Sequence, residues 1–277
     1  MLKIVVCMKQ VPMVTELPWD EQSGTLRRDL AAGMMNPACK HALEAALRLR
    51  EQQGASVTAI TMGPPAAEEV LREALAMGAD RGVLICDAAL AGSDTYATSY
   101  ILARAIQKEI PGCDLVLCGA YTSDSETAQV GPQLAEELQV PSAAYAEHLE
   151  ISGRTLRVRR LVDNFRETLE MECPALITVS MERYAPRYAS FMGLNDAFAE
   201  TEISVLDAKA LGVTDDDLKA FGSRTRVRRV FVRDAQKQNV VITGAAANAA
   251  AEFLDKYQRK ISAVIGKSIE TKKQAQS

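Results

Sequence analysis

Short apolar runs alternate with helical patterns across roughly the first 180 residues of this chain. The apolar runs have the length and composition of buried strands, and we expect strands at residues 3–8, 55–61, 82–86, 115–118 and 175–179. Between them, apolar residues recur at helical spacing, and helices are expected from Asn36-Pro37 to Gly54, from about residue 66 to Gly78, from Asp94, and from Thr127 to Leu138. This order predicts an α/β fold with a doubly wound, mostly parallel, Rossmann-like sheet and right-handed crossovers.

The pattern changes twice in the second half of the chain. Residues 143–172 predict an inserted antiparallel meander, with strands at 145–151, 156–162 and 168–172 around Gly153. Beyond Pro186 the pattern loosens into an extended stretch, until the alanine-rich segment 245–265 predicts a helix. We therefore expect a nucleotide-binding α/β domain at residues 1–186. Residues 187–277 are expected to form an extended C-terminal arm that crosses a partner and packs back.

Composition excludes several classes of function. A chain of 277 residues with 48% hydrophobic and 25% charged residues supports a sizeable core, and its net charge of −4 disfavours nucleic-acid binding. No apolar run is long enough to insert in a membrane, and the first residues lack a secretory signal. The six cysteines form no C-x-x-C pair and only two histidines occur, so we expect no metal site and a cytoplasmic location.

The residues after the predicted strands are the candidates for a binding site, because open α/β sheets bind ligands at the carboxyl ends of their strands. Neither G-x-G-x-x-G nor a P-loop motif is present. Instead, the small polar segment 119–132 leads into the predicted helix at Thr127. Free backbone N–H groups there suit a phosphate or pyrophosphate. The alternative is that Asp124 or Ser125 only caps the helix.

Other positions at the same edge offer a ligand role beside an ordinary structural one. Cys7 and Lys9 place a backbone edge and a cation beyond the first strand, and Met62 precedes a turn where the backbone can approach an adenine. Asn36 would bond a ribose or cap its helix, and Asp94, Thr95 and Thr98 form a cap and first turn. No nucleophile–base pair is visible, so we assign no catalytic residue.

A series of short blocks follows these elements in a characteristic order. They are Val5-Val-Cys-Met-Lys-Gln-Val11-Pro12, Ser23-Gly-Thr-Leu-Arg-Arg28, Met35-Asn36-Pro37, Gly63-Pro64 with Arg72, residues 74–82, Gly92-Ser-Asp94-Thr95, Asp124 with Thr127-Ala-Gln-Val-Gly131, Pro174-Ala-Leu-Ile-Thr-Val179 and Pro186-Arg187-Tyr188. Most of these blocks are weak alone. In this order and spacing, over nearly the whole chain, they resemble the electron-transfer flavoprotein beta family.

The resemblance implies a heterodimer with an alpha subunit, in which the beta chain buries an adenine nucleotide and the alpha chain carries a redox FAD near the interface. The residues matching Cys7, Asn36 and Met62 would surround the adenine and ribose. Phosphates would be held by a second set, namely Asp124, Thr127, Ala128, Gln129 and Val130. With Lys9, Asp94, Thr95 and Thr98, these are the expected cofactor-binding residues.

The family has two branches. One holds AMP as a structural filler and carries electrons from acyl-CoA dehydrogenases. The other holds FAD in the beta chain, oxidises NADH there and bifurcates the electron pair. The segments 127–136, 92–95 and 222–227 resemble the second branch more, so FAD with NADH as donor is expected, with AMP as the alternative. On this interpretation the chain is an electron-carrier subunit and not an enzyme by itself.

Several segments depart from the family pattern. Beyond Pro-Arg-Tyr, the family's AMP branch is commonly basic, whereas residues 190–198 are apolar and acidic here. We expect Phe191, Met192 or Leu194 to anchor an acyl-CoA dehydrogenase or a similar flavoenzyme, although each could equally pack in the core. Arg224 stands where the bifurcating branch often has proline, and the turn after the second meander strand is also atypical.

Three rival interpretations remain open at this point. A stand-alone ATP- or AMP-binding sensor would explain the nucleotide loop but not the long segment after residue 186. An enzyme that activates substrates with ATP is expected to have a pyrophosphate-binding loop after the first strand. Residues 7–12 do not resemble such a loop. A subunit that holds AMP structurally, with no redox centre of its own, differs from the bifurcating interpretation only in cofactor content.

Overall fold

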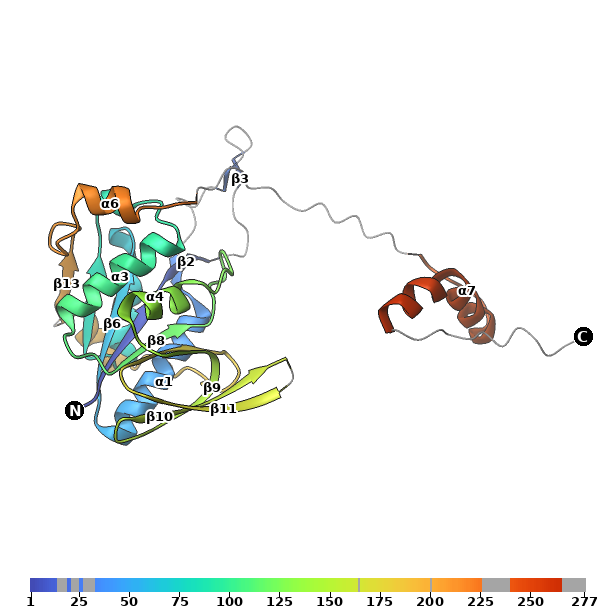
Figure 1. The fold of residues 1–277 in the computed structure, drawn as a ribbon, viewed down its shortest axis with the longest axis horizontal. Helices are drawn as coiled ribbons and strands as arrows, with labels where there is room; N and C mark the ends of the chain where they lie inside the picture. The colour runs from blue at the N-terminus through green and yellow to red at the C-terminus, as the bar shows by residue number, and fades with distance from the viewer. Residues whose placement is uncertain are drawn as a thin grey trace, which may run out of the picture. The chain divides into compact units, whose positions relative to one another are not determined.

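The computed structural model describes residues 1–13, 19–20, 25–26, 33–163, 165–199, 201–225 and 240–265. The chain divides into two compact units, Met1–Val230 and Phe231–Ser277. The first unit is built on a nine-stranded sheet in the order β11-β10-β9-β12-β8-β1-β6-β7-β13 (Figure 1). Six of its strands are parallel neighbours in the sheet: β1 (Lys3–Met8), β6 (Ser56–Met62), β7 (Arg81–Ile85), β8 (Leu115–Gly119), β12 (Ala175–Val179) and β13 (Ile203–Leu206). The predicted doubly wound α/β fold is confirmed.

Helices cover both faces of the sheet. One face packs against α1 (Pro37–Gln53) and α2 (Glu68–Met77), and the other against α3 (Thr95–Glu109) and α4 (Val130–Leu138). Alternate residues of the first strand serve the two faces, because side chains along a strand point to opposite sides. Ile4 and Val6 join the α1 and α2 core, whereas Val5 and Cys7 join the α3 and α4 core.

The ends of the helices follow the local sequence signals. Gly54 and Gly78 adopt left-handed backbone conformations that end α1 and α2, as expected of a glycine at this position. The carboxylate of Asp94 accepts a hydrogen bond from the backbone N–H of Ala97 at 3.0 Å, so the predicted cap of α3 is confirmed.

The predicted meander is also present, and it extends the main sheet. β9 (Ser142–Ser152) pairs in parallel with β12, and the antiparallel strands β10 (Thr155–Val162) and β11 (Phe165–Glu172) follow it outward. Two small antiparallel sheets complete the strand set of the described residues: β2 (Gln10–Pro12) with β5 (Gly33–Met35), and β3 (Trp19–Asp20) with β4 (Thr25–Leu26). Apart from its strand residues 25–26, the charged hairpin at residues 23–28 lies outside the described residues.

Two expectations about chain course are corrected. The helix expected from Thr127 begins at Val130, because Glu126 and Ala128 hold positive φ angles of 49° and 54° that interrupt any helix. The stretch expected to be extended after Pro186 contains α5 (Phe191–Ala199), β13 and α6 (Asp215–Phe221). Since α5 packs on α2 and β13 pairs with β7, the first unit continues well past residue 186.

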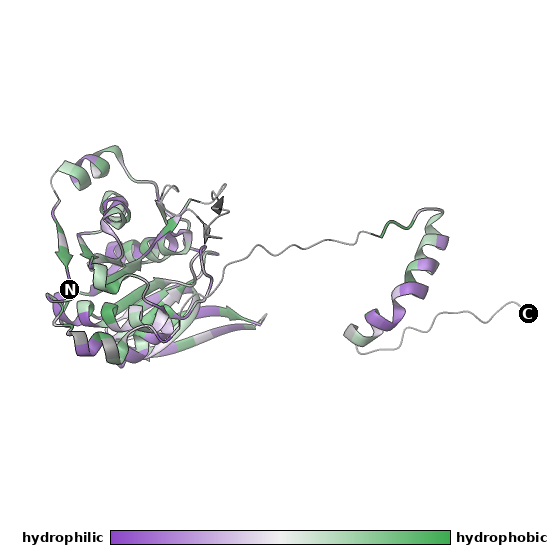
Figure 2. Cartoon of the chain, turned by 90° about the horizontal axis from the view of Figure 1, so that it is seen from above, coloured by the Kyte–Doolittle hydropathy of each residue, from purple (hydrophilic) through white to green (hydrophobic). Residues whose placement is uncertain are grey.

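The second unit contains the predicted terminal helix, α7 (Ala246–Ile265). Hydrophilic and hydrophobic residues alternate along it in Figure 2. Within the described residues, no helix of the two units combines the length and apolar character that crossing a bilayer requires.

Candidate functional site

The candidate site lies where the chain changes direction in the sheet. From β1 the chain proceeds through β6 and β7 on one side, and then returns to place β8 on the other side of β1. Ligands bind at such a switch point, beyond the carboxyl ends of the two diverging strands. Here the residues that follow β1 and those that follow β8 meet, and they include most of the predicted phosphate-binding segment.

Lys9 and Asp124 join these two loops. The Lys9 Nζ atom lies 2.9 Å from both carboxylate oxygens of Asp124, and the Asp124 side chain is only 17% exposed. Burial alone would raise the pKa of Asp124, but the hydrogen bonds from Lys9 and Thr122 and the charge of Lys9 outweigh it and lower that pKa. Asp124 is therefore ionised at neutral pH, and its pair with Lys9 holds the loop after β8 against the end of β1.

Asn36 fastens the same loop from the other side. It does not cap α1 with its side chain, as the local pattern allowed. Instead its amide nitrogen donates to the carbonyl of Tyr121 at 2.9 Å, and its oxygen accepts from the backbone N–H of Ser123 at 3.0 Å. The residue is almost fully buried and its own backbone N–H donates to Lys9. Asn36 thus links β1, α1 and the loop after β8.

Gly119 allows the loop to leave the sheet so close to α1. A Cβ atom at this position would lie 2.7 Å from the carbonyl carbon of Ala38 and 2.8 Å from the backbone nitrogen of Cys39. Such distances are shorter than van der Waals contact, so a side chain here would push the loop and the start of α1 apart.

The backbone between Asp124 and α4 leaves several donors free. Ala128 has a positive φ of 54°, and Gln129 follows with φ −94° and ψ −31°. Alternation of left- and right-handed residues points successive N–H groups into one concavity, which is a common anion-binding arrangement. Within the described part of the chain, the N–H groups of Thr127, Ala128 and Gln129 donate to no protein acceptor. Thr127 and Gln129 are exposed and Ala128 is partly exposed, just before the start of α4.

Cys7 and Met62 line the strand ends beneath this loop. Cys7 is 8% exposed and lies opposite Cys118 in the parallel pair of β1 and β8. Its hydrogen bond with Cys118 and its burial raise the pKa of the Cys7 thiol well above the ordinary value, so the thiol stays neutral. Met62 ends β6 and is partly buried against the α3 side of the core. Both place uncharged, apolar side chains at these strand ends, where an adenine ring could pack.

The start of α3 meets the start of α4. The Thr95 hydroxyl donates to the side-chain oxygen of Gln129 at 3.0 Å. Thr98 lies one turn further along α3 and is partly exposed. The structure therefore brings all twelve predicted binding residues to the same edge of the sheet, and their roles in nucleotide binding stay predictions.

Asp94 has a second role that the sequence did not reveal. One oxygen caps α3, and the other accepts hydrogen bonds from the backbone N–H groups of Arg224 and Thr225 at 2.8 and 2.9 Å and from the Thr225 hydroxyl. The backbone N–H of Asp94 donates to Ser223. Burial opposes ionisation, but these hydrogen bonds outweigh it and lower the pKa of Asp94. The carboxylate thus fixes residues 223–225 over the start of α3, a contact between positions about 130 residues apart.

A hollow of about 830 Å³ adjoins this contact. It lies between α3, the short helix η3 (Ala88–Leu90) and α6. Tyr100 and Phe221 form one wall, with their rings stacked 4.5 Å apart. No site was predicted here from the sequence, because the hollow depends on α6, which the sequence pattern did not indicate.

The helix α5 carries the predicted docking residues. Phe191, Met192 and Leu194 are 88%, 69% and 40% exposed, so they do not belong to the core. The opposite side of the helix is held tightly: a Cβ on Gly193 would lie 2.4 Å from the carbonyl oxygen of Ala76 in α2. The Arg72 guanidinium donates to the carbonyls of Ala197 and Thr201 near the end of the helix.

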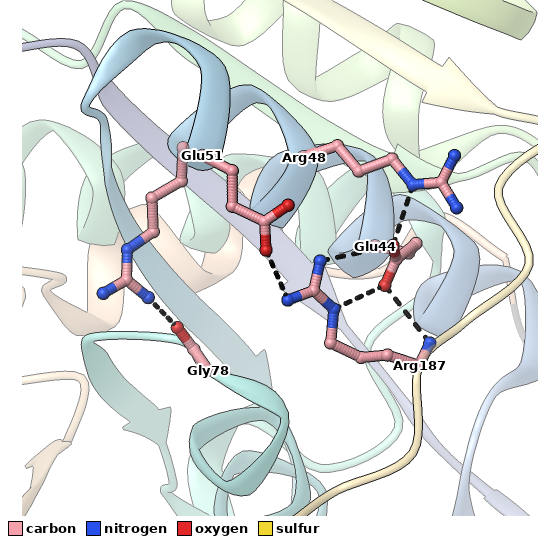
Figure 3. A network of polar contacts seen from close by, with 6 residues as sticks. Glu44, Arg48, Glu51, Gly78 and Arg187 are labelled. Atoms are coloured by element: carbon pink, nitrogen blue, oxygen red, sulfur yellow. Dashed lines mark hydrogen bonds and ion pairs between the residues drawn. The ribbon is translucent and has the colours of Figure 1, made fainter.

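A network of charged side chains fixes the chain just before α5 (Figure 3). Glu44 of α1 is 3% exposed, and the Arg187 guanidinium donates to it at 2.9 and 3.3 Å. The backbone N–H of Arg187 and the Nε of Arg48 donate to the same carboxylate, and Arg187 also donates to Glu51 at 2.7 Å. Since both ends of α5 are held, its exposed apolar residues are presented on a preformed helix.

Comparison with known proteins gives consistent results. The family model "Electron transfer flavoprotein domain" matches residues 24–211. The chain is 40% identical over 255 residues to an electron transfer flavoprotein subunit beta of Thermoanaerobacterium thermosaccharolyticum, covering 92% of this chain and 97% of the relative. It is 39% identical over 254 residues to the caffeyl-CoA reductase-Etf complex subunit CarD of Acetobacterium woodii, covering 91% and 96%. Identity to the acryloyl-CoA reductase electron transfer subunit gamma of Anaerotignum propionicum is 37% over 265 residues, covering 94% and 99%.

Proposed function

Because this chain belongs to the electron transfer flavoprotein beta subunit family, we propose that it holds an adenine nucleotide inside a heterodimer with an alpha subunit. The observation that carries the proposal is the free donor array at Thr127, Ala128 and Gln129, at the switch point of the sheet. Backbone donors aimed into one concavity suit the phosphates of a nucleotide. Lys9 adds a positive charge at the same place.

The residues around the donor array would contact different parts of the nucleotide. Thr127, Ala128, Gln129 and Val130 would donate to the phosphates. Asp124 would not bind the phosphates itself, because its ionised carboxylate would repel them. It would instead hold its own loop and Lys9 in place, and the charge of Lys9 neutralises that of the carboxylate. The uncharged surface of Cys7 and Met62 suits the adenine. Asn36 keeps these parts in register from beneath.

We further propose that the nucleotide is FAD and that the heterodimer carries electrons from NADH or an acyl-CoA dehydrogenase to other redox partners by flavin-based bifurcation. A bound flavin accepts two electrons together and releases them singly. Two relatives support this choice, one named as a subunit of a caffeyl-CoA reductase-Etf complex and one as an electron transfer subunit of an acryloyl-CoA reductase. The 830 Å³ hollow beside α3, which lies against the segment held by Asp94, offers room beyond an adenine nucleotide. Structural AMP is the alternative.

The proposal is tested by the nucleotide content of the chain purified with its alpha subunit. After denaturation and chromatography, we expect two FAD per heterodimer and no AMP. One FAD and one AMP would retain the nucleotide site but overturn the bifurcation proposal. A preparation with no adenine nucleotide beyond the FAD of the alpha chain would overturn the site itself.

Residues 187–277 are proposed to include the arm that embraces the alpha subunit. The helix α7 lies in the separate second unit, where most of its described side chains are at least partly exposed and Phe253 is 46% exposed. An amphipathic helix of this kind is stabilised when its apolar side is buried by a partner. We place the heterodimer in the cytoplasm, where the six free cysteines stay reduced.

Electron exchange with the dehydrogenase is proposed to involve docking on α5. Replacing Phe191 with alanine is expected to raise the KM for the partner dehydrogenase about 30-fold, because an exposed aromatic anchor contributes on the order of 2 kcal/mol to an interface. The same change should leave the nucleotide content and the unfolding midpoint unaltered, since the ring is 88% exposed. Val205, 60% exposed on the edge strand β13, provides the control, and its replacement with alanine should leave the KM unchanged. An unchanged KM for the Phe191 variant would contradict docking at this residue.

A further inference from the structure

A second hollow, of about 380 Å³, lies between α1 and the antiparallel strands. The candidate nucleotide site adjoins the first residues of α1, whereas this hollow adjoins its last turns at Arg48, Leu49 and Gln52. Side chains of β9, β10 and β11 form the opposite wall, and Arg183 and Tyr184 close one end. Nothing in the proposed nucleotide chemistry uses these residues.

The hollow is strongly cationic in an acidic chain. Five arginines line it, against two glutamates, although the whole chain has a net charge of −4. The glutamates are already engaged: Glu167 pairs with Arg160 at 2.8 Å and Glu147 lies 3.9 Å from Arg166. A low-dielectric wall lined with one sign of charge concentrates the field at its mouth. The hollow therefore attracts carboxylates or phosphates.

Two of the arginines are left without a counter-charge. Arg159 and Arg183 have no ion-pair partner among the residues that the structure describes. The nearby carboxylate of Glu44 is not available to them, because it is saturated by Arg187 and Arg48 (Figure 3). Arg159 and Arg183 are both exposed and line the same hollow. Each therefore offers a ligand a guanidinium group that has no ion-pair partner among the described residues.

The floor of the hollow is rigid. Tyr184 is 7% exposed, and its hydroxyl accepts a hydrogen bond from the backbone N–H of Leu149 at 2.8 Å. The guanidinium of Arg48 lies over the Tyr184 ring, 5.7 Å from its centre, while it is bonded to Glu44. A preformed floor lowers the entropic cost of binding, because the groups that meet the ligand are already ordered.

The strands β10 and β11, which contribute residues to the hollow, also carry exposed apolar side chains. Leu161 is 43% exposed near the end of β10, and Phe165 is 72% exposed at the start of β11. Figure 1 shows β10 and β11 projecting past the helical layers, and Figure 2 shows hydrophobic bands interrupting hydrophilic ones along them. A mixture of arginine, aromatic and aliphatic side chains is typical of protein interfaces. A free anion would leave these apolar side chains exposed to solvent.

We propose that this hollow is part of the heterodimer interface and receives an acidic segment of the alpha subunit. Carboxylates of that segment pair with Arg159 and Arg183, and an apolar residue beside them covers Leu161, which shares a face of β10 with Arg159. The inference rests on the proposed heterodimer. A permanent partner fits better than a transient one, because a surface with exposed apolar side chains and unpaired cations is better suited to burial in a stable interface. The transient partner has its own apolar surface on α5.

The test compares charge reversals at these two arginines of the beta chain within the heterodimer. Arg159→Glu and Arg183→Glu are expected each to raise the Kd of the heterodimer at least about 10-fold, measured by sedimentation of diluted samples at two salt concentrations. Both variants should also weaken the salt dependence of Kd, because fewer charges meet across the interface. Arg157→Glu, which breaks exposed pairs with Glu150 and Glu170, is the matched control and should leave Kd within about 2-fold.

Unchanged Kd values for both reversals would overturn the inference. So would a higher dehydrogenase KM with an intact heterodimer, which would assign the hollow to that partner. Pyrophosphate, titrated into the intact heterodimer, should not bind at these arginines; binding that Arg159→Gln abolishes would show an open anion site instead. Nucleotide content is measured in the same samples. A wild-type chain that forms no heterodimer contradicts the proposed function, whereas an intact heterodimer indifferent to the reversals contradicts only this inference.

Discussion

Replacing Arg187 with alanine is expected to destabilise the first unit by about 3 kcal/mol. The reason is the environment of Glu44, which is 3% exposed and accepts three hydrogen bonds from Arg187. Removing one partner of a buried pair leaves an uncompensated charge, and Arg48 alone remains to neutralise it. For a unit of this size the loss corresponds to a fall of roughly 6–12 °C in the unfolding midpoint, measured by calorimetry on the purified heterodimer.

Two companion variants separate this effect from simple loss of contacts. Glu51→Ala removes a pair in which the carboxylate is 58% exposed, so it should cost less than about 1 kcal/mol. Adding Glu44→Gln to Arg187→Ala should recover part of the stability, because an uncharged amide no longer requires a cation. If Arg187→Ala unfolds no earlier than Glu51→Ala, the buried carboxylate does not depend on Arg187.

The same network sets a pH dependence. Burial alone would raise the pKa of Glu44, but the hydrogen bonds from Arg187 and Arg48 outweigh burial and lower it below its ordinary value. A carboxyl whose pKa is lower in the folded state stabilises the fold above its unfolded pKa of about 4.3, and that contribution is lost as the pH falls through the folded value. The stability difference between wild type and Arg187→Ala should therefore shrink below about pH 4.

Local signals in the sequence were sufficient for most of the sheet and its helices. Apolar runs located the parallel strands β1, β6, β7, β8 and β12, and glycines and Asp94 marked helix ends, because these features depend on residues within one or two turns. The same reasoning failed at Thr127, where a helix was expected. The positive φ of Ala128 is imposed by the surrounding loop, and alanine gives no local sign of it.

Long-range contacts were beyond the reach of pattern analysis. Asn36 was weighed as a helix cap, but its side chain bonds to residues 85 and 87 positions away. The segment containing α5, β13 and α6 was expected to be extended, because α5 turns its largest apolar residues outward and so lacks the usual buried stripe. The two ends of α5 are held by contacts of Arg72 and Arg187, in which the partners lie more than 120 residues apart in the sequence. Site residues were nevertheless brought to one edge, since topology alone places strand ends together.

The loop before α4 gives the second large expected effect: Ala128→Val should weaken nucleotide binding about 100-fold. A β-branched residue is a strained occupant of positive φ, and Ala128 stands at φ 54°. The valine variant would relax to negative φ and turn the N–H groups of Ala128 and Gln129 away from the concavity. Each charge-assisted hydrogen bond lost to a phosphate costs about 1.5–3 kcal/mol. The readout is the adenine nucleotide retained by the purified heterodimer, together with the Kd for AMP after nucleotide removal.

Ala128→Gly is the matched control at the same position. Glycine adopts positive φ without a steric cost, so this variant should keep the nucleotide with an affinity close to that of wild type. Comparing the valine and glycine variants separates backbone conformation from side-chain chemistry, because alanine, glycine and valine all lack polar side-chain atoms. Full nucleotide content in the valine variant would show that the donors at residues 127–129 do not hold the phosphates. Lys9, paired with Asp124 beside the loop, would then be the remaining candidate for that role.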